Sequence, residues 1–204
     1  MGGTIAKLVK QRHHVHIVDM TNGEPTPRGS IETRAAESAA AAQVLGVQRT
    51  LLGLKNREVQ HTVEARHKLA ALIRIHKPNA LFVPYTPDAH PDHVAVSRIA
   101  EDARFDAKLT KSTIPGDPWH PKRVIYYFCT HLRLNINPTF CIDVSDTVEQ
   151  KMEAAACYAS QVSADLLRMV RLTGDYFGTR AGCAHAEPFF SHEVMAFNGL
   201  DQLV

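Results

Sequence analysis

Long apolar segments, paired cysteines and an excess of one charge are all missing from this sequence. No apolar run approaches the roughly 18 residues that a membrane-spanning helix needs, and the start of the chain has no apolar core of a signal peptide. The four cysteines are widely spaced and form no Cys-x-x-Cys pair, which argues against a disulfide framework and a thiolate zinc knuckle. These absences predict a cytoplasmic protein with no membrane partner.

The charges are nearly balanced, since 23 Lys and Arg face 21 Asp and Glu for a formal net charge of +2. The basic residues are scattered among the acidic ones and form no group, so no segment is typical of binding to a phosphate backbone. We therefore expect no nucleic-acid partner. With 204 residues and a hydrophobic share of 45%, the chain is predicted to form a single domain over residues 1–204.

Helical and strand-like segments alternate along the chain, which predicts an α/β fold with parallel strands. Gly46 is predicted to end an alanine-rich helix, and Asp146 with Glu149 resembles a capping box for a later helix. The helices are expected at about Thr4–Gln11, Ile31–Leu45, His61–His76, from His93 to Leu109, from Asp146 to Ala159, and Ala164–Phe177. The strands are expected at about Val15–Met20, Thr50–Leu54, Ala80–Tyr85, Val124–Cys129 and Thr139–Val144.

A cluster of titratable residues, Asp88 and His90-Pro91-Asp92-His93, follows the apolar strand Ala80–Tyr85. Open parallel sheets bind ligands at the carboxyl ends of their strands. Zinc catalysis needs imidazole and carboxylate ligands, with a second titratable group nearby to transfer protons. The cluster therefore predicts a metal-dependent active site. The same residues also fit a polar loop that caps the next helix, with Asp92 at a favourable N-terminal position.

The loop after Met20 should open onto the same edge of the sheet, which places Asn22, Glu24 and Tyr85 beside the cluster. Each of these three is a candidate for substrate binding and equally a candidate for a structural role. Arg34, by itself, would most simply lie on a solvated helix face.

Several blocks resemble the LmbE-like (PIG-L) family of zinc N-deacetylases, in the order in which that family has them. The segment from Phe82 to His93 resembles the second conserved block of the family. The earlier blocks are Gly2–Lys7, Thr21–Glu24 and Arg34 with Glu37. Tyr127–His131 and Glu187–Phe190 further resemble the subgroup that deacetylates N-acetylglucosaminyl malate in bacillithiol synthesis.

This resemblance implies a Rossmann-like three-layer fold with a mostly parallel sheet, and a hydrolase that removes acetate from a small amino-sugar. It implies one Zn²⁺ per site, with His93 as a ligand. His90 matches a protonated imidazole that stabilises the oxyanion or protonates the departing amine, and Asp92 would hold that ring in its tautomer. Arg34 matches an arginine that lines the sugar site. A homo-oligomer is compatible with all of these assignments.

The family's first block, histidine-proline-aspartate-aspartate, supplies two zinc ligands and the general base, and it lies upstream of the segment matched by Gly2-Gly3-Thr4. We therefore expect the first strand to be truncated and the zinc site of these 204 residues to be incomplete. A late start is favoured over a real loss, because His90, Asp92 and His93 retain the residue types that catalysis needs. The alternative is a non-catalytic, sugar-binding remnant. A nucleotide-binding Rossmann domain is disfavoured, because no Gly-x-Gly-x-x-Gly joins a strand to a helix.

Overall fold

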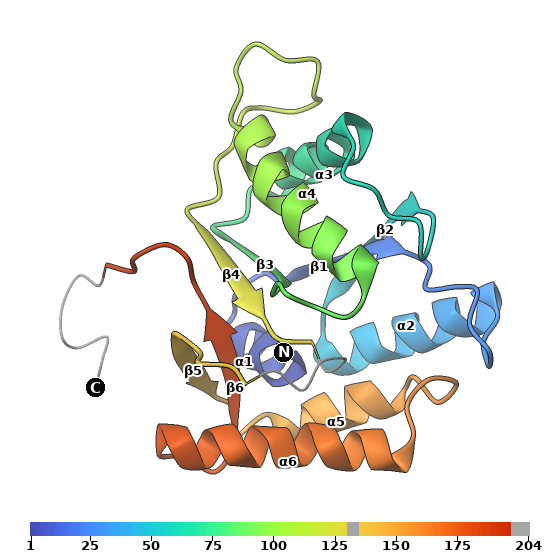
Figure 1. Cartoon of the computed structure of the whole chain (residues 1–204), viewed down its shortest axis with the longest axis vertical. Coiled ribbons are helices and arrows are strands. Elements are labelled where there is room, and N and C mark those ends of the chain that lie inside the picture. Colours follow the sequence, from blue (N-terminus) through green and yellow to red (C-terminus); the bar gives the residue numbers. More distant parts are fainter. Residues whose placement is uncertain (130–134, 197–204) are drawn as a thin grey trace.

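The computed structural model describes residues 1–129 and 135–196 and shows helices on two sides of a set of short strands (Figure 1). In chain order the elements are α1 (Gly2–Lys10), β1 (His16–Thr21), α2 (Ile31–Leu45), β2 (Gln48–Leu54), α3 (Val63–His76), β3 (Ala80–Pro84), α4 (Pro91–Ala107), β4 (Arg123–Tyr127), β5 (Phe140–Asp143), α5 (Val148–Ala156), α6 (Ala164–Ala181) and β6 (Ala186–Phe190).

A residue with a hydroxyl side chain precedes three of the helices. Ser30, Thr62 and Ser163 precede α2, α3 and α6, and each accepts a hydrogen bond from a backbone N–H in the first turn. Such caps satisfy donors that have no partner inside the helix. Gly46 ends α2 with a φ of 69°, a left-handed conformation that suits glycine. These local signals explain why α2 has its predicted bounds, Ile31–Leu45.

The start of α5 differs from the prediction. Thr147 is the residue before the helix and its side chain makes no capping hydrogen bond, so the expected capping box at Asp146 is wrong. Asp146 instead pairs with Lys7 and Lys10 of α1, at 3.0 and 2.8 Å. The carboxylate is therefore used to join α1 to the segment before α5, a contact between residues far apart in the sequence.

The strands form two sheets. Strands β1 and β2 pair in parallel, and the second sheet has the order β3-β4-β6-β5. Strands β3 and β4 are parallel, whereas β6 runs antiparallel to both β4 and β5. The predicted α/β, Rossmann-like fold is confirmed, although the larger sheet is mixed. Within the described residues no strand joins β1 to β3.

The helices divide into two groups that cover the strands. Helices α3 and α4 pack on each other, and a cluster of buried side chains that includes Ile73, Val83 and Ile99 joins them to β3 and β4. Helices α1, α2 and α5 share a second cluster, which contains Ala6 and Ala41, and α6 packs on β6. Figure 1 shows α3 and α4 at one end of the view and α5 and α6 at the other. Among the described residues, no helix has the length and apolar character needed to cross a membrane.

Candidate active site

The predicted cluster lies on the turn that connects β3 to α4. His90 is the residue that precedes α4, and its Nδ1 atom accepts a hydrogen bond from the backbone N–H of Asp92 at 3.2 Å. Asp88 in turn accepts a hydrogen bond from the backbone N–H of His90 at 2.7 Å. The cluster therefore caps a helix, as the structural interpretation of the sequence has it, and the functional interpretation stays a prediction.

The hydrogen bond to Nδ1 assigns the tautomer of His90. A neutral imidazole has one nitrogen that donates and one that accepts. Because Nδ1 of His90 accepts from Asp92, the ring proton is assigned to Nε2 on the basis of this hydrogen bond. The rings of His90 and His93 stack, with their centroids 4.8 Å apart and an angle of 20° between their planes.

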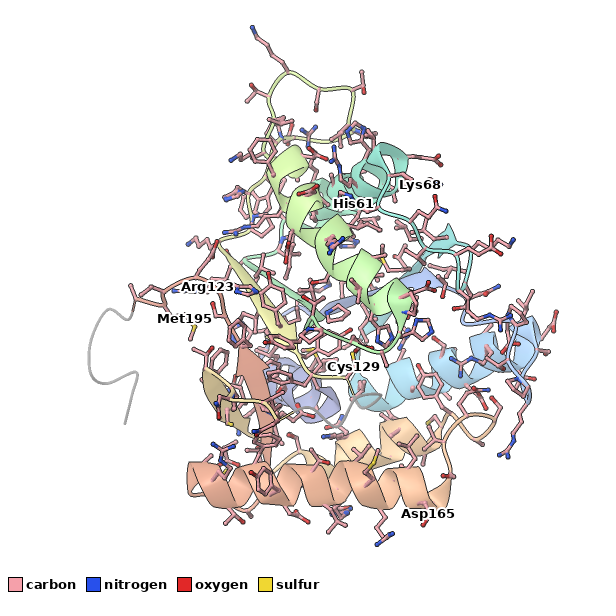
Figure 2. The ribbon with its side chains drawn as sticks, viewed as in Figure 1. His61, Lys68, Arg123, Cys129, Asp165 and Met195 are labelled. Carbon is pink, nitrogen blue, oxygen red and sulfur yellow. The ribbon has the colours of Figure 1, made fainter. Side chains whose placement is uncertain are left out.

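Three potential metal ligands converge beside this turn. The Nδ1 atom of His93 lies 3.1 Å from a carboxylate oxygen of Asp88, whose side chain is almost fully buried. Asp88, His93 and Cys129 each offer one ligand atom, and these atoms lie within 4.8 Å of one another. Cys129 follows β4, and Figure 2 shows it near the middle of the molecule. Oxygen, nitrogen and sulfur atoms that could hold a metal ion therefore lie close together.

The pairing of β3 with β4 explains why these groups meet. The two strands are parallel, and Pro84 at the end of β3 lies opposite Tyr127 at the end of β4. Asp88 and Cys129 therefore leave the sheet at the same edge. Sequence reasoning missed Cys129, because a single cysteine without a neighbouring ligand carries no local signal. Only its position two residues after a strand connects it to the site.

The charges of Asp88 and Cys129 depend on each other. Burial favours the neutral acid of Asp88, but hydrogen bonds from the His90 backbone and the His93 ring outweigh this effect and lower its pKa. Burial and the nearby charge of Asp88 raise the pKa of the Cys129 thiol to about 12. Without a cation, the pair is therefore a carboxylate next to a neutral thiol.

Asp92 connects this turn to the loop after β2. Its buried carboxylate accepts hydrogen bonds from the backbone N–H groups of Arg57 and Val59, at 2.7 and 3.3 Å. Asp92 contacts Nδ1 of His90 through its own backbone N–H. Its carboxylate thus holds the loop after β2 and its peptide group contacts the His90 ring, so the role of Asp92 in holding that ring stays a prediction.

Arg34, Glu24 and Asn22 lie together. The Nε atom of Arg34 is 3.9 Å from Glu24, and its Nη1 atom is 3.6 Å from Glu37. Within the described part of the chain, these two buried nitrogens have no hydrogen-bond acceptor, since both carboxylates are too distant for one. Asn22 accepts a hydrogen bond from the backbone N–H of Glu24 and so shapes the loop. The guanidinium thus has unused donors.

Tyr85 belongs to an aromatic group at the edge of the larger sheet. Its ring contacts Phe128 and Phe190, with centroids 4.7 and 5.1 Å apart, and its backbone N–H donates to Tyr127. This packing places Tyr85 beside the chain that leads to Cys129.

A cavity of about 860 Å³ lies beyond the end of β4, beside the first residues of β6 and against α6. Cys129 and Phe128 line it on one side, and Thr173 and Tyr176 line it on the other. Among the described residues, Asn22, Glu24, Arg34 and Tyr85 are not part of its lining. The cavity therefore reaches the group of potential metal ligands from a direction that the sequence did not predict.

Two segments, Tyr127–His131 and Glu187–Phe190, resembled the N-acetylglucosaminyl-malate subgroup, and the structure describes them to different extents. Thr130 and His131 of the Tyr127–His131 segment lie outside the described residues. Glu187 is almost fully buried, and its carboxylate accepts hydrogen bonds from the backbone N–H groups of Gly3 and Thr4 at the start of α1, at 3.1 and 2.7 Å. Glu187 therefore anchors a helix.

The comparisons with known proteins identify the family of this chain. A family model described as PIG-L, GlcNAc-PI de-N-acetylase, matches residues 1–104. The chain belongs to the PIG-L family. A diacetylchitobiose deacetylase of Thermococcus kodakarensis is 27% identical over 206 residues, which cover 92% of this chain and 75% of that protein.

Solved structures of similar fold cover almost the whole chain. The conserved protein TT1542 of Thermus thermophilus has a TM-score of 0.90 and 31% identity, over 96% of this chain and 89% of that one. GalB, the 4-carboxy-2-hydroxymuconate hydratase of Pseudomonas putida, has a TM-score of 0.83 and 19% identity, over 98% and 92%. Since GalB is a hydratase and this identity is low, that likeness shows the fold alone.

Proposed function

We propose that this chain is a single-domain, zinc-dependent hydrolase that removes the acetyl group from an N-acetylglucosamine derivative. One observation carries the proposal. In a member of the PIG-L family, an imidazole and a carboxylate, His93 and Asp88, converge at the edge of a parallel strand pair, beside a second imidazole, His90, that has a different hydrogen-bonding partner. Metal-dependent amide hydrolysis needs this division between a group that binds the ion and a group that donates a proton.

The donor set fits the proposed metal. Zinc binds histidine nitrogen, carboxylate oxygen and cysteine sulfur at about 2.0–2.3 Å, and all three donor types lie within 4.8 Å of one another here. His93 would hold the ion, with Asp88 beside it. When bound, a zinc ion polarises the acetamide carbonyl and makes water acidic enough to attack near neutral pH.

His90 is the proposed proton donor. With its Nδ1 atom engaged by Asp92, the ring has its proton on Nε2. An N–H donor of this kind stabilises the negative charge that develops on the acetyl oxygen. In its imidazolium form the ring supplies the proton that the departing amine requires, and it then returns to the neutral imidazole.

Arg34 is the proposed contact for the substrate, together with Asn22, Glu24 and Tyr85. Its Nε and Nη1 donors are buried without an acceptor among the described residues. A planar guanidinium suits the hydroxyl and carboxylate oxygens of a sugar derivative. N-acetylglucosaminyl malate carries oxygens of both kinds. We propose it as the substrate, and a cytoplasmic location in keeping with the four free cysteines.

The decisive assay measures acetate and free amine released from N-acetylglucosaminyl malate and from N,N′-diacetylchitobiose, with the bound metal quantified in the same preparation. We expect zinc to be required, and the malate conjugate to be the better substrate. Faster hydrolysis of the disaccharide would keep the activity and overturn the substrate assignment. Binding of either sugar by zinc-loaded protein without release of acetate would overturn the proposed activity and favour a sugar-binding protein.

A further inference from the structure

Arg34, the proposed substrate contact, lies between two carboxylates that form hydrogen bonds with other residues. Glu24 accepts from the backbone N–H and the hydroxyl of Thr26, at 2.7 and 2.6 Å. Glu37 accepts from the backbone N–H and the hydroxyl of Ser160, at 2.6 and 2.7 Å. The two carboxylates lie 3.9 and 3.6 Å from the Nε and Nη1 atoms of Arg34. They are near enough to offset its charge and too distant to accept its hydrogen bonds.

The face of the Arg34 guanidinium has a partner of its own. The guanidinium carbon lies 5.3 Å from the centroid of the Tyr158 ring, which is within the range of a cation–π contact. Arg49 is held differently, because its Nε and Nη2 groups both donate to Asp19. A pair of that kind uses the N–H groups that could bind a ligand, whereas contact with a ring face uses none of them.

Tyr158 belongs to a turn of residues 158–161 that connects α5 to α6 (Figure 1). Its carbonyl accepts from the backbone N–H of Gln161 at 2.9 Å, and its ring packs against the buried cluster of α1, α2 and α5. Ser160 in the same turn binds one of the two carboxylates beside Arg34. The side-chain amide of Gln161 donates to Thr26, which binds the other. One turn therefore holds the guanidinium and both of its charged neighbours.

We propose that Tyr158 is a positioning residue of the substrate site, which fixes the plane of the Arg34 guanidinium and leaves its Nε and Nη1 donors available for substrate oxygens. The inference rests on the proposed role of Arg34. These two donors are buried and have no acceptor among the described residues. Because the ring fixes their direction before the substrate arrives, less side-chain freedom is lost on binding. Gly23 leaves room for this arrangement, since a Cβ atom there would lie 2.9 Å from the Nη2 atom of Arg34.

The simplest alternative is that Tyr158 only fills space beside a buried cluster, as a large aromatic side chain often does. Its removal would then affect ligand binding through a general loss of structure. The two interpretations differ in whether the effect on binding depends on Arg34. A double-mutant cycle measures this dependence.

The test is calorimetric titration of the metal-free 204-residue chain with N-acetylglucosaminyl malate, which measures binding without turnover. We expect Tyr158→Leu to weaken binding by about fivefold or more, as for the loss of one partly buried cation–π contact. Tyr158→Phe keeps the ring and should restore affinity to within about twofold of the wild type. In an Arg34→Met chain, which binds more weakly, Tyr158→Leu should have little further effect.

The matched control is Phe105→Leu. It also removes a ring that contacts a cation, the Lys108 ammonium at 4.2 Å, at the opposite end of α4 from His90. This variant should bind the ligand as the wild type does. Thermal unfolding of every variant checks that the fold is retained.

A second measurement needs no ligand. Protons over the face of an aromatic ring resonate upfield, so the side-chain Nε–H of Arg34 should show such a shift in the wild type and in Tyr158→Phe. The shift should be lost in Tyr158→Leu. Arg34→Met identifies the resonance by its absence.

Four results would overturn the inference: an Arg34 resonance that is the same in Tyr158→Leu, undiminished binding by that variant, an equal loss of binding with and without Arg34, or no binding by the wild type. The outcome is separable from that of the deacetylase assay. Acetate release by a wild type in which Tyr158→Leu binds normally would retain the proposed function and reject the positioning role. A loss of binding that depends on Arg34, in a protein that releases no acetate, would do the reverse.

Discussion

Two histidines three residues apart have different partners in this site, and their partners give them different chemistry. His93 faces the Asp88 carboxylate, which favours a ring that is fixed for binding a cation. His90 accepts a hydrogen bond from the peptide group of Asp92, which favours a ring with its proton on the opposite nitrogen. The two rings stack on each other, so the proposed metal ligand and the proposed proton donor are neighbours.

Substitution of each histidine should separate these functions. His93→Ala should lose bound metal on dialysis, because it removes a ligand. His90→Ala should retain the metal and lower turnover by about a hundredfold or more, because one proton-transfer or oxyanion contact is lost. Metal analysis and acetate release on the same samples provide the two measurements. Equal loss of metal from both variants would mean that the two roles have been exchanged.

Helix α1 is held in place by the charge of a residue that is far away in the sequence, Glu187. Glu187 of β6 accepts hydrogen bonds from two backbone N–H groups and the hydroxyl of Thr4, and its carboxylate lies 2.8 Å from Lys151 of α5. A negative charge at a helix N-terminus satisfies donors that lack partners there. Gly3 lets the side chain of Val144 approach α1 closely, since a Cβ atom at position 3 would lie 2.9 Å from Val144.

Glu187→Gln should therefore destabilise the protein, by about 2–4 kcal/mol near neutral pH, since it removes a buried charge that has several partners. Burial of Glu187 favours its neutral form, but the positive charges of the Met1 amine and Lys151 outweigh this and hold its pKa well below the ordinary value. The stabilisation is thus complete above the ordinary pKa of about 4.3. It is lost as the pH falls from there through the lower, folded-state pKa.

The measurement is urea unfolding of wild type and variant across this pH range. The difference in free energy of unfolding between them should shrink as the solution is acidified below about pH 4. Glu149→Gln is the control, because its exposed carboxylate pairs with Arg171 at 2.8 Å on the surface, and such pairs contribute little. A difference that stays constant with pH would show that the Glu187 charge is not the source of the stabilisation.

At the scale of the whole molecule, the sequence predicted the features that depend on residues close together in the chain. The bounds of α2 follow from Ser30 and Gly46, and the position of the His90 turn follows from the apolar strand before it. It could not predict contacts between distant residues. Cys129 reaches the site through the pairing of β3 with β4, and Asp146 is drawn from its expected cap by lysines of α1. A carboxylate or a thiol has several possible partners, and only the fold selects among them.

The anchor between Glu187 and α1 also affects the order in which the chain folds. The two partners are separated by more than 180 positions, and contacts of such high sequence separation form slowly. During synthesis α1 emerges before β6, and its N-terminus cannot be secured until β6 has left the ribosome. The docking of α1 is therefore expected to be among the last steps of folding. Hydrogen exchange should accordingly find the first turn of α1 protected later in refolding than the turns of α3 and α4, which pack on each other from nearby segments.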